Sequence, residues 1–244
     1  MRLSWLLLPI WWSAISHDPS ARVPEPAMRP VQPATRLDVG SFTILVGGQR
    51  AGREQFSIQQ GRAADGVAFE LRSESAMGDR RAAVRLETDS AGTPVRYSLE
   101  ERTGATVSLR LGGQRVRGRF AILSRSTTGE AAREFLLLPG ALVLEDDGLL
   151  QYAVIVRGRV VPVGDSIALP VLMPVANRQG TVYLALESAV DTVAIAGSRR
   201  PARRWRITTE SGERRLVWAD SDDRVLRVEI PARRFEALRD DIPR

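Results

Sequence analysis

The chain contains no cysteine and no lysine, and its single histidine is His17. Without cysteine it has no disulfide, no thiolate metal ligand and no thiol nucleophile. Without lysine it has no Schiff base and no Ser-x-x-Lys dyad. One histidine, close to the N-terminus, leaves no Ser-His-Asp triad and no histidine zinc site. These absences remove most nucleophilic and metal-dependent mechanisms, and we expect no catalytic residues, no metal and no cofactor.

Residues 1–16 have the features of a secretory signal peptide. A basic start is followed by the uncharged run "LSWLLLPIWWSAIS", which ends in a small-x-small pattern. We expect cleavage after Ser16, with Ala21 as the second choice. A retained membrane anchor is the alternative, but a spanning helix needs about 20 apolar residues and Pro9 interrupts this shorter run. The sequence therefore predicts a soluble periplasmic or secreted protein.

The chain after the signal peptide divides into a linker and one domain. Residues 17–36 contain five prolines and no apolar periodicity, which is typical of an extended linker. Residues 37–244 are enough to bury a single large core.

All 35 basic residues are arginine, against 29 acidic residues, for a net charge of +6. A basic chain can indicate a nucleic-acid partner, but export argues against one. We expect instead an anionic membrane surface, a lipid head group or an acidic envelope polymer.

Apolar and polar residues alternate from residue 41 onward, which is typical of strands with one buried face. Turn sequences such as "DSAGTP", "RTGA" and "ADSDDR" separate the strands. The pattern predicts a mainly β fold: a single large curved antiparallel sheet, a half-barrel or open barrel, with one or two short helices. The clearest alternating sets are Val67, Phe69 and Leu71; Ala82, Val84 and Leu86; Val95, Tyr97 and Leu99; Val107, Leu109 and Leu111; and Leu226, Val228 and Ile230.

Two segments depart from this alternation. Residues 145–159 place apolar residues at helical spacing between an acidic start and a basic end, which favours a helix, although "YAVIVRG" also suits a strand. After Pro231, Phe235 and Leu238 lie three residues apart, which predicts a short terminal helix.

The stretch "VGGQRAGREQFSI" at 46–58 superficially resembles a phosphate-binding loop. It lacks the Gly-Lys-Ser/Thr of a Walker loop and the G-x-G-x-x-G spacing, and a strand follows it. We therefore interpret it as a structural hairpin containing Gly48, Gly52 and Glu54, with glycines at positive φ. An anion-binding nest in the same loop is the alternative.

An arginine cluster surrounds Trp205, which we expect to lie in the core together with Trp218. In a strand, Arg204 and Arg206 face outward while Trp205 faces inward. The cluster is either a solvated strand face or a patch for an anionic ligand or partner. Its members are Arg199, Arg200, Arg203, Arg204 and Arg206.

A pair of carboxylates is the remaining catalytic possibility, as in glycoside hydrolysis. The candidates are Glu54, Glu187, Glu210 and Glu229. Charged residues on strands usually lie on the solvated face, so we do not expect such a pair.

The hairpin and the tail together resemble exported bacterial proteins of the domain of unknown function 3108 type. The hairpin shows Gly-x-x-x-Gly-x-Glu at 48–54, the tail shows Trp-x-Asp at 218–220, and a later strand contains Glu229 and closes at Pro231. The resemblance spans about residues 41–233. It implies an antiparallel β half-barrel similar to periplasmic lipoprotein carriers, with no catalytic residues.

We therefore expect a non-enzymatic periplasmic protein of the cell envelope. Its curved sheet would bind an apolar or acylated ligand, such as a lipid, or an envelope partner. The alternatives are an envelope glycan hydrolase that uses paired carboxylates and a structural or assembly module without a ligand. An apolar concave lining favours the first, and two facing carboxylates favour the hydrolase.

Overall fold

The computed structural model describes residues 35–61, 66–146 and 148–243. The chain divides into two units, Met1–Pro33 and Ala34–Arg244, and every described residue belongs to the second. The predicted signal peptide and nearly all of the predicted linker lie outside the described residues. Within the described ranges, no helix is long and apolar enough to cross a membrane.

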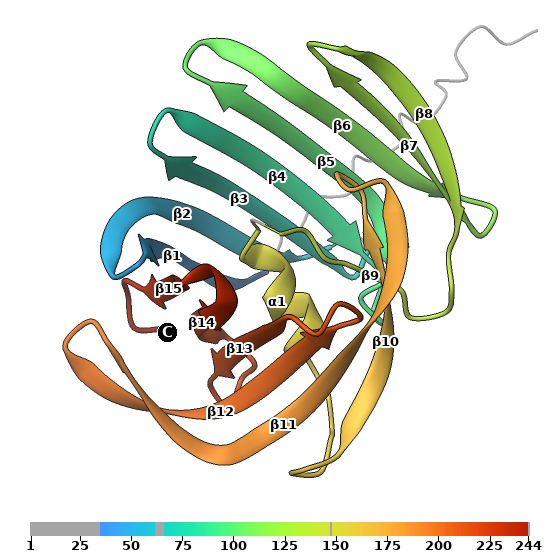
Figure 1. Ribbon diagram of the computed structural model, residues 1–244. Coiled ribbons are helices and arrows are strands. Elements are labelled where there is room, and N and C mark those ends of the chain that lie inside the picture. The colour runs from blue at the N-terminus through green and yellow to red at the C-terminus, as the bar shows by residue number, and fades with distance from the viewer. Residues whose placement is uncertain (1–34, 62–65, 147, 244) are drawn as a thin grey trace, which may run out of the picture. The chain divides into compact units, whose positions relative to one another are not determined.

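One sheet of 15 strands curls around a short central helix, α1 (Figure 1). The strand order is β8-β7-β6-β5-β4-β3-β2-β1-β15-β14-β13-β12-β11-β10-β9. Neighbouring strands are antiparallel except β9 and β10, which are parallel. The predicted mainly β, curved and open antiparallel sheet is therefore confirmed.

The first eight strands form a continuous meander from the middle of the sheet to one edge. They are β1 (Arg36–Val46), β2 (Gln49–Gln60), β3 (Phe69–Met77), β4 (Arg80–Thr88), β5 (Pro94–Thr103), β6 (Thr106–Val116), β7 (Arg119–Ser126) and β8 (Gly129–Leu136).

The remaining strands start at the other edge and return to β1. They are β9 (Leu142–Val143), β10 (Ser166–Met173), β11 (Arg178–Ile195), β12 (Ser198–Thr209), β13 (Arg214–Ala219), β14 (Val225–Ile230) and β15 (Phe235–Arg239). Helix α1 spans Leu150–Val156, and a 3-10 turn, η2, spans Pro231–Arg233.

The glycine-rich stretch forms the hairpin between β1 and β2, as predicted. Gly47 and Gly48 have φ of +60° and +81°, which suits the two-residue turn that matches strand twist. Gly52 has a different role from the one expected, because it lies inside β2 without a positive φ. A Cβ there would meet the Ala76 carbonyl oxygen and lie 2.6 Å from Met77 Cγ. Gly52 therefore permits close approach of β2 to β3.

The predicted terminal helix is wrong, because Phe235–Arg239 form strand β15 between β1 and β14. Among the described residues after Ile230, only the 3-10 turn η2 is helical. In β15 the alternation of two places Ala237 and Arg239 in the interior, both nearly fully buried. Hydrogen bonding to β1 and β14 and burial of one face stabilise the strand. These interactions outweigh the weak preference for a helix that the three-residue spacing of Phe235 and Leu238 indicated.

Helix α1 confirms the helix favoured within 145–159, but only over seven residues. The acidic and basic residues that suggested a helix dipole lie outside it, and its first turn contains no acidic residue. All seven residues of α1 are buried. A helix that is buried on every side needs an enclosed environment, and the interior of the curled sheet provides one (Figure 1).

The sheet remains open between its edge strands, β8 and β9. Near one end of this gap, Gln179 Nε2 at the start of β11 donates a hydrogen bond to the Leu136 carbonyl oxygen, 2.9 Å away. Most of β8 is exposed on both faces. The domain is therefore an open barrel.

The two predicted core tryptophans lie on opposite faces of the sheet. Trp205 is fully buried in the main core with the α1 residues. Trp218 belongs to a second, smaller cluster with Val193, Ile195 and Leu226. Trp218 also pairs in register with Arg204, on the face away from Trp205.

Candidate ligand-binding site

A cavity of about 160 Å³ lies between the concave face of β2–β5 and the chain that leads into α1. The sheet lines it with apolar residues such as Val84, Leu86 and Leu99. Leu144 and Leu150 line it from the opposite side. Alternation places these sheet residues on the face that carries the main core, which is why the lining is mainly apolar.

Glu54 of β2 is a buried acidic group in this lining, with only 1% of its surface exposed. Its Oε2 accepts a hydrogen bond from the Leu149 backbone N–H, with an N···O distance of 3.4 Å. Its Oε1 is also buried and has no hydrogen-bond partner among the described residues. Buried carboxyl oxygens normally have a partner, so this atom marks a place where a ligand group fits.

Burial raises the pKa of Glu54 from 4.5 to about 7. Loss of water around the carboxylate is the main cause, since it disfavours the charged form. The backbone N–H groups of Leu149 and Leu150 and the nearby Ser73 hydroxyl lower the pKa in part. Near neutral pH, Glu54 is therefore poised between its neutral and ionised forms.

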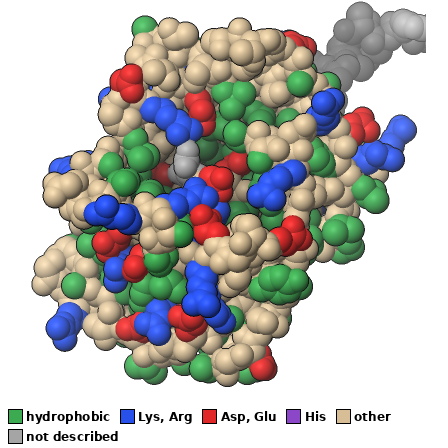
Figure 2. Space-filling model, viewed as in Figure 1, with side chains coloured by type: hydrophobic (Ala, Val, Ile, Leu, Met, Phe, Trp, Pro, Cys, Tyr) green, Lys and Arg blue, Asp and Glu red, His purple; other side chains and the backbone are tan. Residues whose placement is uncertain are grey.

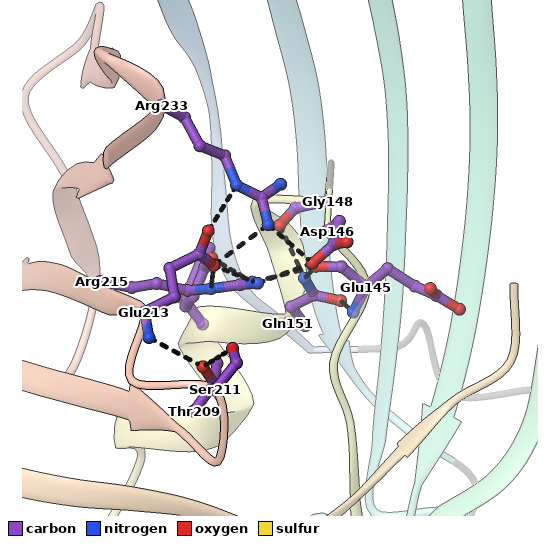
Figure 3. Close-up of polar contacts among 10 residues, drawn as sticks. Glu145, Asp146, Gly148, Gln151, Thr209, Ser211, Glu213, Arg215 and Arg233 are labelled. Carbon is purple, nitrogen blue, oxygen red and sulfur yellow. Dashed lines mark hydrogen bonds and ion pairs between the residues drawn. The ribbon is translucent and has the colours of Figure 1, made fainter. Parts of the chain in front are cut away.

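The chain segment before α1 is fixed by the side chain of Gln151 (Figure 3). Gln151 Oε1 accepts from the Glu145 backbone N–H at 2.7 Å, and Nε2 donates to the Gly148 carbonyl oxygen at 2.8 Å. Glu145 Oε1 in turn accepts from the Val175 backbone N–H at 2.9 Å. These bonds hold the wall of the cavity that faces the sheet.

Arg215 of β13 ties this wall to the opposite part of the sheet (Figure 3). It is 2% exposed and donates to Asp146 Oδ1 at 2.7 Å, to Tyr152 Oη at 3.1 Å and to Glu213 Oε1 at 2.9 Å. Arg233 of η2 also contacts Asp146 and Glu213. Burial lowers the pKa of Arg215, but Tyr152, Asp146 and Glu213 raise it above its ordinary value, so the guanidinium stays charged.

The predicted arginine cluster lies on β12, away from this cavity. Arg204 and Arg206 share one face and both pair with Glu187, while Arg204 also pairs with Asp191. Arg203 pairs with Asp223. Acidic side chains therefore neutralise part of the cluster, and they come from β11 and from the turn before β14.

Arg199 and Arg200 remain as the outer part of the cluster. They lie at the start of β12, near the hairpin that joins it to β11. On the face drawn in Figure 2, acidic and basic side chains intermingle, and the coloured residues show no large area of one charge. The number of arginines available to an anionic surface is thus smaller than the sequence suggested.

The four glutamates considered for a hydrolytic pair do not share this site. Among them, Glu54 alone lines the cavity. Glu187 pairs with arginines of β12, Glu210 accepts from the Thr181 backbone N–H, and Glu229 pairs with Arg227. Each of these three has a structural partner.

The cavity itself was not predicted from the sequence. The available signal was Glu54, which lies in phase with the apolar Phe56 and Ile58 on β2. A charged residue on the apolar face of a strand is a candidate for a buried functional group. Nothing in the sequence pattern places Leu144 or Leu150 opposite it.

The fold and the cavity together define a β-barrel-like domain with an internal helix and a mainly apolar site. No protein-family model matches the chain, and no curated protein matches it. Among solved structures, it is similar to a β-barrel-like protein of domain of unknown function DUF1849 from Brucella abortus. The TM-score is 0.49 and the identity 8%, over 84% of this chain and 95% of that chain.

Proposed function

We propose that this protein is an exported, non-enzymatic binding protein that holds an apolar ligand, or the apolar end of an acylated one, in the cavity beside α1. The observation that carries the proposal is the mainly apolar cavity of about 160 Å³ enclosed between the sheet and the helix. Export is part of the proposal and rests on the predicted signal peptide. A relationship to the exported proteins of the domain of unknown function 3108 type is also part of the proposal, and it rests on the short hairpin and tail motifs.

The volume limits the size of the group that is held. A cavity of about 150 Å³ holds a benzene molecule, so a volume of about 160 Å³ suits a ring or a short alkyl chain. Burying a six-carbon chain at about 0.8 kcal/mol per CH₂ gains roughly 5 kcal/mol. Costs of association reduce this gain, so we expect weak affinity for a single short chain. A longer acyl chain would extend out of the cavity.

A hydrolytic role has less support. The glutamates expected to form a pair lie apart, and the lining is mainly apolar. The lining does contain other carboxyl groups, but Glu101 pairs with Arg80, and Asp146 pairs with Arg215 and Arg233. The mainly apolar lining therefore supports binding better than glycan hydrolysis.

Filling the cavity tests the proposal. Ala82 of β4 lines the cavity, while its neighbour Ala83 lies exposed on the other face. Ala82→Phe should abolish binding of 1-hexanol in ligand-observed NMR, and Ala83→Phe should leave it unchanged. Equal binding by wild type and both variants, with all three folded, would show that the cavity is not the site. Native mass spectrometry of protein from its own cells should then identify the natural ligand.

A further inference from the structure

The apolar cavity contains an unsatisfied acid. Glu54 is 1% exposed, and its Oε1 forms no hydrogen bond of normal geometry with a described residue, although the Ser73 hydroxyl lies near enough to the carboxyl to lower its pKa. An unpaired buried oxygen costs about 1 to 3 kcal/mol. A ligand with a donor at this point would remove that cost, whereas a purely apolar ligand would leave it in place.

The charge of the lining favours a cation. Its titratable groups besides Glu54 are Arg80 on β4, Tyr97 and Glu101 on β5, and Glu145 and Asp146 before α1. Among the described residues of the lining there are therefore four carboxyl groups and one guanidinium. The lining contributed by β3 and by α1 carries no titratable side chain among its described residues.

Two of the other acids in the lining form ion pairs, whereas none is seen for Glu54 among the described residues. Arg80 lies 2.8 Å from Glu101, and Asp146 is held by Arg215 and Arg233 from outside the cavity. No ion pair joins Glu54 to any described residue. An excess of negative charge between walls of low dielectric focuses a potential that attracts cations.

We propose that the ligand carries an amine on its apolar group, and that Glu54 binds the ammonium as its counter-ion. The apolar part would lie against Val84, Leu86 and Leu99, with the ammonium placed to donate to Glu54 Oε1. This inference rests on the proposed binding function and names the chemical class of its ligand. A charge-assisted bond of this kind is stronger than a bond between neutral groups.

The proposal has a pH dependence with a defined sign. An amine with a pKa near that of lysine, about 10.4, remains charged below about pH 9. Burial raises the pKa of Glu54 to about 7. At about pH 5.5 only about 3% of Glu54 is ionised, and at about pH 8.5 nearly all of it is. Amine binding should therefore strengthen as the pH rises through 7.

The experiment compares two probes of equal length, n-hexylamine and 1-hexanol, by isothermal titration calorimetry or ligand-observed NMR. For the wild type, hexylamine affinity should rise about 30-fold between about pH 5.5 and pH 8.5, following the ionised fraction. Hexanol affinity should change much less than this, because the alcohol stays neutral and its hydroxyl can donate to an oxygen of Glu54 whether the carboxyl is ionised or neutral.

Two variants complete the test. Glu54→Gln should lower hexylamine affinity at least about tenfold at pH 8.5 and lower hexanol affinity much less, because the Gln amide oxygen can still accept from a hydroxyl. Glu229→Gln is the matched control, since Glu229 pairs with Arg227 outside the cavity, and it should bind both probes as the wild type does. If Glu54→Gln does not fold, the wild-type pH profile still decides the question.

The failures are distinguishable. If hexanol binds in the cavity but hexylamine binds no better at high pH, the amine proposal is overturned and the binding function stands. The same holds if Glu54→Gln folds and keeps full hexylamine affinity. If neither probe binds at any pH, both the amine proposal and the proposed function fail.

Discussion

The buried ion pair between Arg239 and Asp38 should be among the most sensitive points of the fold. Arg239 on β15 donates from Nη1 and Nη2 to the two carboxyl oxygens of Asp38 on β1, at 2.9 and 2.7 Å. The two side chains are 0% and 5% exposed. The guanidinium carbon also lies 5.1 Å from the centre of the Phe56 ring. The pair therefore fixes the last strand against the first, inside the barrel.

Replacing Arg239 by Met should lower the free energy of unfolding by about 3 to 5 kcal/mol, because Asp38 remains buried without its partner. Domains of this kind have total stabilities of about 5 to 15 kcal/mol, so the variant will be marginal. The double variant Asp38→Leu, Arg239→Met removes both charges and should recover a large part of the loss.

Urea unfolding followed by circular dichroism measures these differences. The matched control is Arg119→Met: Arg119 lies 3.9 Å from Glu134, and the two side chains are 58% and 62% exposed. That variant should lose less than about 1 kcal/mol. A loss below about 1 kcal/mol for Arg239→Met would refute the reasoning, as would a double variant no more stable than the single one.

Three further predictions concern Glu54, Gly52 and the pair Arg199 and Arg200. Since burial raises the pKa of Glu54 from 4.5 to about 7, its neutral form stabilises the fold below pH 4.5 and this contribution is lost as the pH rises through 7. Glu54→Gln should therefore unfold like the wild type near about pH 4 but be about 3 kcal/mol more stable near pH 8.5, and equal stability at both pH values would contradict the burial argument. Gly52→Ala should lower the free energy of unfolding by about 1 to 3 kcal/mol, because the added methyl group crowds β3. It should lower the melting temperature more than Gly48→Ala does, because a Cβ at Gly48 meets no atom within 4 Å. A larger loss for Gly48→Ala would show that the positive φ matters more than the available space. Replacing Arg199 and Arg200 by Gln should leave the melting temperature unchanged and weaken binding to anionic liposomes by about 1 kcal/mol per arginine at low salt, whereas undiminished binding would leave only a solvated strand face.

The sequence predicts the sheet well, because alternation is a local property that survives in the fold. The hairpin at Gly47–Gly48, the inward Trp205 and the outward Arg204 all follow from a period of two and from glycine at positive φ. Strand β15 shows the limit. Its five residues are too few to separate periods of two and three, and its partner β1 lies at the other end of the sequence.

The site could not be predicted, since it depends on contacts between distant segments. Glu54 is buried because the chain near Leu149 covers it, 95 residues later. The ion partners of the arginine cluster show the same difficulty. Asp191 and Asp223 lie near the cluster only in the folded chain, where β11 and the turn before β14 bring them to Arg204 and Arg203. The number of arginines in the sequence therefore overestimates the exposed positive charge.

The position of the cavity follows from how the interior is filled. The diameter of a barrel grows with the number of strands, and the side chains of an eight-stranded barrel just fill its interior. A curled sheet of 15 strands therefore encloses more space than its own side chains can fill. Helix α1 supplies the missing volume and is bound to β13 through Tyr152 and Arg215. Three small residues of β3 and β4, namely Ser73, Ser75 and Ala82, line the cavity together with Leu150 and Gln151 of α1. Large apolar residues there would close the cavity, so the small ones create the space beside Glu54.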